Sequence, residues 1–148
     1  MNGIKRDQRF VIHWLFSLLL FVLLLALSLS LEIYKKFPVF GFIGYGIVIL
    51  NLLWALNQAT KPWHYIAVSL FLILFGTLGS LDIVLSKDEM LETLLLLNYE
   101  WLNMSGLNPQ SLDDYVNVLV LLLNVFTSAL AGSALFYGLN RRNFEAQD

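Results

Sequence analysis

The chain contains no cysteine and few charged residues. Without cysteine it has no disulfide, no thiolate metal site and no redox thiol, so cysteine usage does not indicate its compartment. Only 14% of its 148 residues are charged, whereas 58% are hydrophobic. A soluble domain of this size has too much surface for its volume to bury so many apolar side chains. The composition therefore predicts a protein that has lipid as the solvent for most of its length.

The signatures of common soluble enzymes and of nucleic-acid-binding proteins are also missing. The sequence has no phosphate-binding glycine loop, no HExxH pattern and no nucleophile elbow. Its nine basic residues form no extended patch, which argues against nucleic acid as a partner. We therefore expect a protein that is not an enzyme, with the lipid bilayer and either itself or other membrane-protein subunits as partners.

Four apolar runs are long enough to be transmembrane helices. The first, Phe10–Leu31, has 22 residues without a formal charge, and a helix of that length matches a hydrocarbon core of roughly 30 Å. Ala26 and Ser28 have the small side chains of a signal-peptide cleavage site, but the run is longer than a signal core of about 7–15 residues, which favours an uncleaved span. The predicted fold is all-α: one membrane domain, a four-transmembrane-helix bundle with spans at about 10–31, 39–58, 63–85 and 112–139.

The segment between the third and fourth spans predicts an amphipathic helix at about 87–103. Apolar side chains recur on one face of this stretch and acidic side chains on the other. Its apolar part is too short to span the bilayer, so it is expected at the outer surface, packed on the membrane or docked on a partner. Ser111 is the predicted N-cap of the fourth span, with Asp114 reaching back as in a capping box.

The placement of lysine and arginine predicts the orientation. Four spans put both termini on one side, and that side carries six of the nine basic residues. The positive-inside rule then places both termini in the cytoplasm. The inner side has Lys5, Arg6, Arg9, Lys61, Arg141 and Arg142, and the outer side has Lys35, Lys36 and Lys87.

Small residues at helical spacing mark candidate contact faces between helices, because they let two backbones approach closely in lipid. The candidates are Gly41, Gly44, Gly76, Ser80, Ser128 and Gly132. In the fourth span, Ser128 with Gly132 and Ala129 with Ser133 form overlapping small-xxx-small pairs. The leading functional hypothesis is accordingly an oligomer-forming, accessory or scaffold subunit of a membrane complex.

Three polar residues lie within the predicted spans. Asn51 and Asn124 are near the middles of their helices, where amides usually find a partner across a helix interface. Asp82 is one turn from the outer end, and either an ion pair with Lys87, Lys35 or Lys36 or a role in proton or ion handling accounts for it. An alternative function is a pore or permeability effector, in which these residues line a shared lumen together with Thr127 and Ser128.

His13 and His64 lie at similar shallow depth on the inner side. Each is next to a tryptophan, and such pairs serve as interfacial anchors. In an up-and-down bundle, spans one and three are expected across the diagonal, and diagonal imidazoles can hold a haem between them. The spacing agrees with both interpretations.

The stretches RFVIHWLFSLLLF and PWHYIAVSLFLILFGTLG resemble the first and third spans of the bacterial inner-membrane b-type cytochromes, a four-helix family. The resemblance implies a bacterial inner membrane, haem b as cofactor and His13 as a ligand. The sequence departs from the family where its second and fourth spans carry histidines, since Phe42, Asn117 and Asn124 stand in those regions. We therefore expect no cofactor, with a haem-binding electron carrier as a second alternative function.

Overall fold

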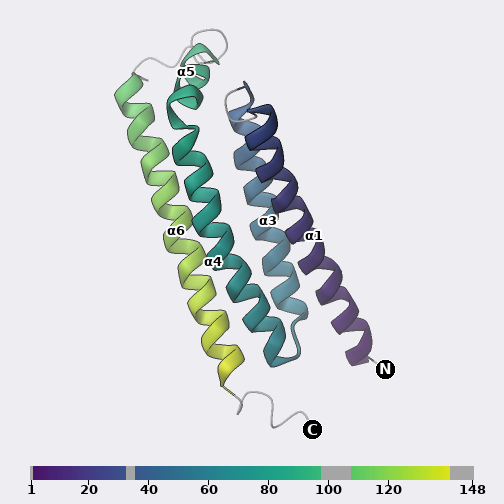
Figure 1. The fold of residues 1–148 in the computed structure, drawn as a ribbon. Helices are drawn as coiled ribbons and strands as arrows, with labels where there is room; N and C mark the ends of the chain where they lie inside the picture. Colours follow the sequence, from purple (N-terminus) through teal and green to yellow (C-terminus); the bar gives the residue numbers. More distant parts are fainter. Residues whose placement is uncertain (1, 33–35, 98–107, 141–148) are drawn as a thin grey trace.

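The computed structural model describes residues 2–32, 36–97 and 108–140, and these residues form helices and short connections without any strand (Figure 1). Four of the helices are long and apolar enough to cross a membrane. The predicted all-α fold is confirmed at the level of a helical bundle. The helices are α1 (Asn2–Leu31), α3 (Pro38–Gln58), α4 (Pro62–Leu85), α5 (Lys87–Leu97) and α6 (Pro109–Leu139).

Proline sets the start of three of these helices. Its fixed φ and missing N–H suit the first helical position, where the backbone N–H has no intrahelical partner. Because Pro109 occupies that position in α6, the N-cap is Asn108, whose side chain accepts a hydrogen bond from the backbone N–H of Ser111 at 2.8 Å. The predicted start at about residue 112 with Ser111 as the cap is therefore wrong. Ser111 is instead the third helical residue, and its hydroxyl accepts from the backbone N–H of Asn108 at 3.0 Å.

The described part of the predicted amphipathic helix is α5, which follows α4 after the single residue Ser86. Met90 is fully buried, and Leu91 and Leu94 pack against the core, whereas the acidic residues of this helix are exposed. The helix therefore packs on its own bundle. Residues 98–103 of the prediction lie outside the described residues.

The long helices associate as two pairs. Helix α1 lies along α3, and α4 lies along α6, with the start of α1 and the end of α6 at the same end of the bundle (Figure 1). The prediction that α1 and α4 lie across the diagonal of the bundle is wrong, because the two helices are in direct contact. Phe21 of α1 packs on Phe71 and Phe75 of α4, with ring centroids 5.8 and 5.0 Å apart.

Close backbone approach within the second pair depends on two glycines. A Cβ at Gly76 would overlap the Thr127 hydroxyl and lie 3.2 Å from its Cβ. A Cβ at Gly138 would lie 2.9 Å from the backbone oxygen of Pro62. Near the middle of this interface the Ser69 hydroxyl donates to the backbone oxygen of Ala131 at 2.8 Å. Packing of small residues and the hydrogen bond from Ser69 to Ala131 thus hold α4 on α6, as is usual for helices in lipid.

The outer surface of the long helices is apolar. Leu29, Phe40 and Phe136 are each more than 70% exposed, and aliphatic and aromatic side chains along all four helices share this exposure. A water-soluble monomer rarely exposes so large an apolar surface. The surface therefore agrees with the sequence in indicating a membrane protein.

Candidate functional site

Asp82 is the most unusual polar residue inside the bundle. It lies on α4, three residues before the end of that helix, and its side chain is only 6% exposed. The Ser28 hydroxyl of α1 donates to Oδ1, and the Tyr45 hydroxyl of α3 donates to Oδ2, each at 2.7 Å. One carboxyl group thus connects α4 to both helices of the other pair. We define Asp82, Ser28 and Tyr45 as the carboxyl–hydroxyl cluster.

The ion pair expected between Asp82 and Lys87 is not formed. The Lys87 amine instead forms an ion pair with Asp113 and donates to the side-chain oxygen of Asn117 at 2.8 Å. Lys36 is exposed and makes no ion pair within the described part of the chain, and Lys35 lies outside it. Lys87 is the first residue of α5, and this places its amine over α6 rather than over the carboxyl–hydroxyl cluster.

Asn51 joins α3 to α1 near the middle of the bundle. Its amide nitrogen donates to the backbone oxygen of His13 and to the Ser17 hydroxyl, each at 2.7 Å. Its amide oxygen is 2.8 Å from Nδ1 of His13, so that nitrogen carries a proton and donates. The imidazole also stacks on Trp54, with ring centroids 5.9 Å apart. These contacts satisfy the amide within the chain.

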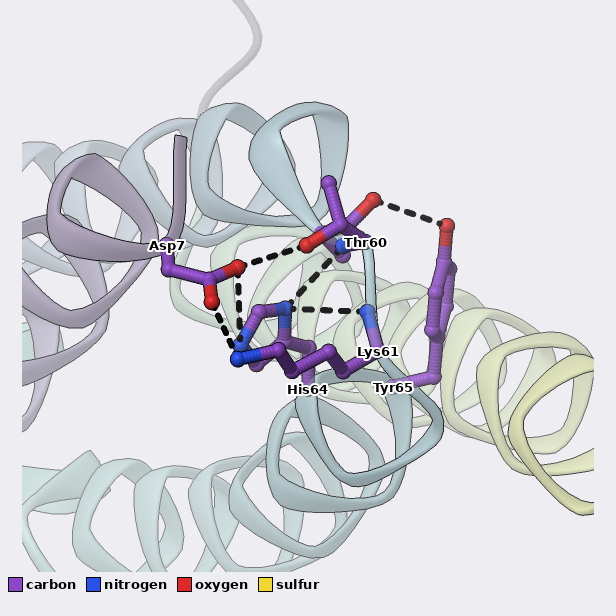
Figure 2. Close-up of polar contacts among 6 residues, drawn as sticks. Asp7, Thr60, Lys61, His64 and Tyr65 are labelled. Carbon is purple, nitrogen blue, oxygen red and sulfur yellow. Dashed lines mark hydrogen bonds and ion pairs between the residues drawn. The ribbon is translucent and has the colours of Figure 1, made fainter. Parts of the chain in front are cut away.

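A second polar cluster lies where α1 begins and α3 connects to α4, and it contains His64 (Figure 2). Asp7 of α1 forms an ion pair with Lys61 and accepts a hydrogen bond from the Thr60 hydroxyl at 2.6 Å. The backbone N–H groups of Thr60 and Lys61 donate to Nδ1 of His64 at 3.0 and 3.3 Å. His64 therefore caps the start of its own helix, and its proton is on Nε2.

The surroundings of His64 do not fit a haem ligand. Its side chain is fully buried, and its ring stacks on Phe10 with centroids 3.9 Å apart. Nε2 faces Asp7 at 3.9 Å and has no hydrogen-bond partner among the described residues. A haem iron would reach this nitrogen only if Phe10 or Asp7 moved. His13 belongs to the Asn51 cluster and His64 to the Asp7 cluster, so the two histidines are in separate clusters.

The predicted contact residues occupy different environments. Gly41 and Ser80 are buried, and Gly44 faces Leu24 of α1, where a Cβ would lie 2.7 Å from a methyl carbon. Gly76 packs on Thr127, as described above. Ser128 and Gly132, in contrast, are exposed, and a Cβ at Gly132 would meet nothing within 4 Å. A contact at these two residues stays a prediction about association between chains.

The residues of the predicted lumen do not gather in a single chain. Asn51 is hydrogen-bonded between α1 and α3, Asp82 between α4 and the first pair, and Thr127 is buried against Gly76. Asn124 is half-buried on α6, and the described residues offer its side chain no hydrogen bond. Any common aqueous path would therefore have to form between chains.

Sequence reasoning identified Asp82 but missed both of its hydroxyl partners, and it missed Asp7 and Thr60. A signal for Ser28 was present, because Ser28 and Asp82 each stand three residues before the end of a helix, and α1 and α4 run toward the same end of the bundle (Figure 1). Equal distance from the helix ends puts both at a depth of about 4.5 Å from the last helical residue. Tyr45 lies seven residues from the start of α3, and its long side chain reaches the same carboxyl group.

No group of three or more His, Asp or Glu side chains that could hold a metal ion occurs in the part of the chain that the structure describes. Comparison of the chain with protein-family models, with curated proteins and with solved structures finds no match.

Proposed function

We propose that this chain is a non-enzymatic integral membrane subunit that assembles with copies of itself through the outer face of α6. The observation that carries the proposal is the open space at Gly132, where an added Cβ would meet nothing within 4 Å. Ser128, Ala129 and Ser133 are exposed beside it. We call these four residues the outer face of α6.

The opposite face of α6 is already used within the chain. Thr127, Ala131, Ala134 and Gly138 are the residues buried against α4. Small residues therefore run along two sides of the same helix, and only one of the sides has an occupant in a single chain. In lipid, helix association depends on close packing because the hydrophobic effect does not favour helix–helix over helix–lipid contact. A second helix seated on Gly132 would gain the same kind of contact that Gly76 gives α4.

The mass of the detergent-solubilised protein tests this proposal. The chain has a mass of 16.9 kDa, and we expect the wild type in mild detergent to have a detergent-corrected mass that is two or more times that value. Gly132→Leu should shift the mass toward 16.9 kDa, because the added side chain holds the partner helix away.

Gly46→Leu is the matched control. Gly46 is also a helical glycine at which a Cβ would meet nothing within 4 Å, but it faces an apolar groove between α3 and α6 rather than the outer face of α6. Both substitutions bring the same gain in helix propensity. A monomeric wild type, or a Gly132→Leu variant with the wild-type mass, would contradict the proposal. If only Gly46→Leu lowered the mass, the interface between chains would lie at the groove between α3 and α6 instead.

We propose further that the protein lies in the inner membrane of a bacterial cell. The end of the bundle at which α1 starts faces the cytoplasm. Lys5, Arg6, Arg9 and Lys61 gather at that end, whereas Lys36 and Lys87 are at the other. Because the chain lacks cysteine, a single introduced cysteine is the only thiol that a maleimide can label. Its labelling therefore shows on which side of the membrane that residue lies. Asp88→Cys should react with an impermeant maleimide in intact spheroplasts, and Lys5→Cys only after lysis. The reverse pattern would overturn this orientation.

A further inference from the structure

We propose that Asn124 recognises its own counterpart in a second copy of the chain, so that two α6 helices pair around a two-fold axis and their amides exchange hydrogen bonds. This pairing rests on the assembly through the outer face of α6, and it adds the residue that selects the partner helix and its register. Small residues alone fit many helices, whereas an amide requires hydrogen-bonding groups at its own depth.

The amide of Asn124 lies in the middle of a membrane-spanning helix. Asn124 is the central residue of the 31-residue helix α6, so at a rise of about 1.5 Å per residue it is about 22 Å from either helix end. The hydrocarbon core is about 30 Å thick, and lipid headgroups do not reach its centre. At that depth lipid offers no hydrogen bond, so another protein group is the natural partner of the amide.

The chain that carries this amide does not supply that partner. Asn124 is half-buried, and although its backbone oxygen accepts from the Thr127 hydroxyl at 3.2 Å, its side chain forms no hydrogen bond with any described residue. Asn51, the other asparagine in the middle of a span, uses both atoms of its amide within the chain. Because an unpaired amide in lipid is costly, Asn124 indicates a contact that a single chain does not contain.

Asn124 lies in one row with the open part of α6. Residues four apart lie above one another on a helix, so Asn124, Ser128 and Gly132 follow each other along the same side. Ser128 and Gly132 are exposed, and a Cβ at Gly132 would meet nothing within 4 Å. A helix seated on these two residues therefore passes Asn124 one turn farther along α6.

A second copy of the chain matches this amide in both depth and chemistry. Copies that share one orientation in the membrane have parallel α6 helices, and their Asn124 residues lie at the same depth. A two-fold axis along the membrane normal then brings a residue against its own counterpart. An amide donates through Nδ2 and accepts through Oδ1, so two facing amides satisfy each other, which two amines or two carboxylates cannot do.

Sedimentation equilibrium of the full chain in density-matched detergent measures this pairing. We expect a dimeric wild type, and we expect Asn124→Leu to raise the dimer dissociation constant about sevenfold, at the average strength of two such bonds between membrane helices. Asn124→Gln keeps an amide at the same place on the helix, so it should retain most of the affinity.

The outcomes separate this pairing from the assembly itself. If the wild type is a dimer that Gly132→Leu dissociates, an unchanged dissociation constant in Asn124→Leu overturns the pairing and leaves the assembly in place. A monomeric wild type overturns both, and a trimer or larger oligomer overturns the two-fold arrangement. If Asn124→Leu abolishes ion conductance in liposomes without weakening the dimer, the amide serves a water-filled path instead.

Oxidative cross-linking tests the two-fold geometry independently of affinity. Ser128→Cys should form a disulfide-linked dimer, because the axis brings the two residues at this position together. Phe126→Cys is the matched control, since Phe126 is also exposed on α6 but lines the groove between α3 and α6. Cross-linking of Ser128→Cys that is no faster than that of Phe126→Cys would overturn the proposal.

Discussion

The contact between Gly76 and Thr127 gives a sharp prediction for the stability of the bundle. Gly76→Ala places a methyl group against the Thr127 hydroxyl and 3.2 Å from the Thr127 Cβ. That hydroxyl is held in place by a 2.7 Å hydrogen bond to the backbone oxygen of Leu123, so it cannot turn away without loss. Overpacking of this kind typically costs about 1–3 kcal/mol of unfolding free energy.

Gly46→Ala is the matched control for this substitution, because Gly46 lies outside the proposed interface on α6. Both glycines are inside long helices, so the gain of about 1 kcal/mol in helix propensity is common to the two variants and cancels from their difference. Nothing lies within 4 Å of a Cβ at Gly46. We therefore expect Gly76→Ala to be less stable than Gly46→Ala by about 1–3 kcal/mol. Thr127→Ala removes the overlapping oxygen, so it should restore most of the loss when combined with Gly76→Ala.

The assay is reversible unfolding in mixed detergent micelles at increasing SDS fraction, followed by circular dichroism. The double-mutant cycle then gives the coupling between positions 76 and 127, for which contacting residues typically show about 0.5–3 kcal/mol. If Gly76→Ala is as stable as Gly46→Ala, and its effect is independent of Thr127→Ala, the close approach of α4 and α6 at this point is refuted.

Three further predictions concern the polar clusters. Asn51→Leu should lower the unfolding free energy by about 2 kcal/mol, since each interhelical hydrogen bond in lipid contributes about 0.6 kcal/mol. Asn124→Leu is the matched change at a residue without such hydrogen bonds in the single chain, and it should be near neutral in the same assay on the monomer. Asp7→Asn should cost less than about 1 kcal/mol, because the Lys61 side chain is half exposed, and the loss should shrink at high salt; an equal loss at both salt concentrations would contradict an ion-pair role. The dithionite-reduced absorption spectrum should show no Soret band, because His64 is enclosed; a Soret band that disappears in His13→Ala would contradict this.

The sequence predicted the helices well because hydropathy and length determine which segments can cross a bilayer. The runs ending at Leu31, Gln58 and Leu85 end where the structure ends α1, α3 and α4 to within a residue or two. The start of α6 was missed by about three residues, because Ser111 was taken as the N-cap, whereas Asn108 is the cap and Pro109 the first helical residue.

The sequence did not predict which face each helix turns to its neighbours. A span that is apolar all round carries no pattern that separates a lipid-facing from a protein-facing side. Gly76 and Gly132 therefore look alike in the sequence, although one packs on Thr127 and the other is exposed. For the same reason the partners of Asp82 were sought among lysines near the helix ends, and the hydroxyls of Ser28 and Tyr45 were not considered.

The order of the cluster residues along the chain bears on membrane insertion. Ser28 and Tyr45 are synthesised before Asp82, and their helices form the pair that contacts α4. An aspartate at the centre of an isolated span opposes insertion by about 2.5–3.5 kcal/mol, and by less toward the end. Insertion in the order of synthesis would place both hydroxyl donors in the bilayer before α4. A chain shortened to begin at α4 would meet that barrier without them and should insert less efficiently than the full chain.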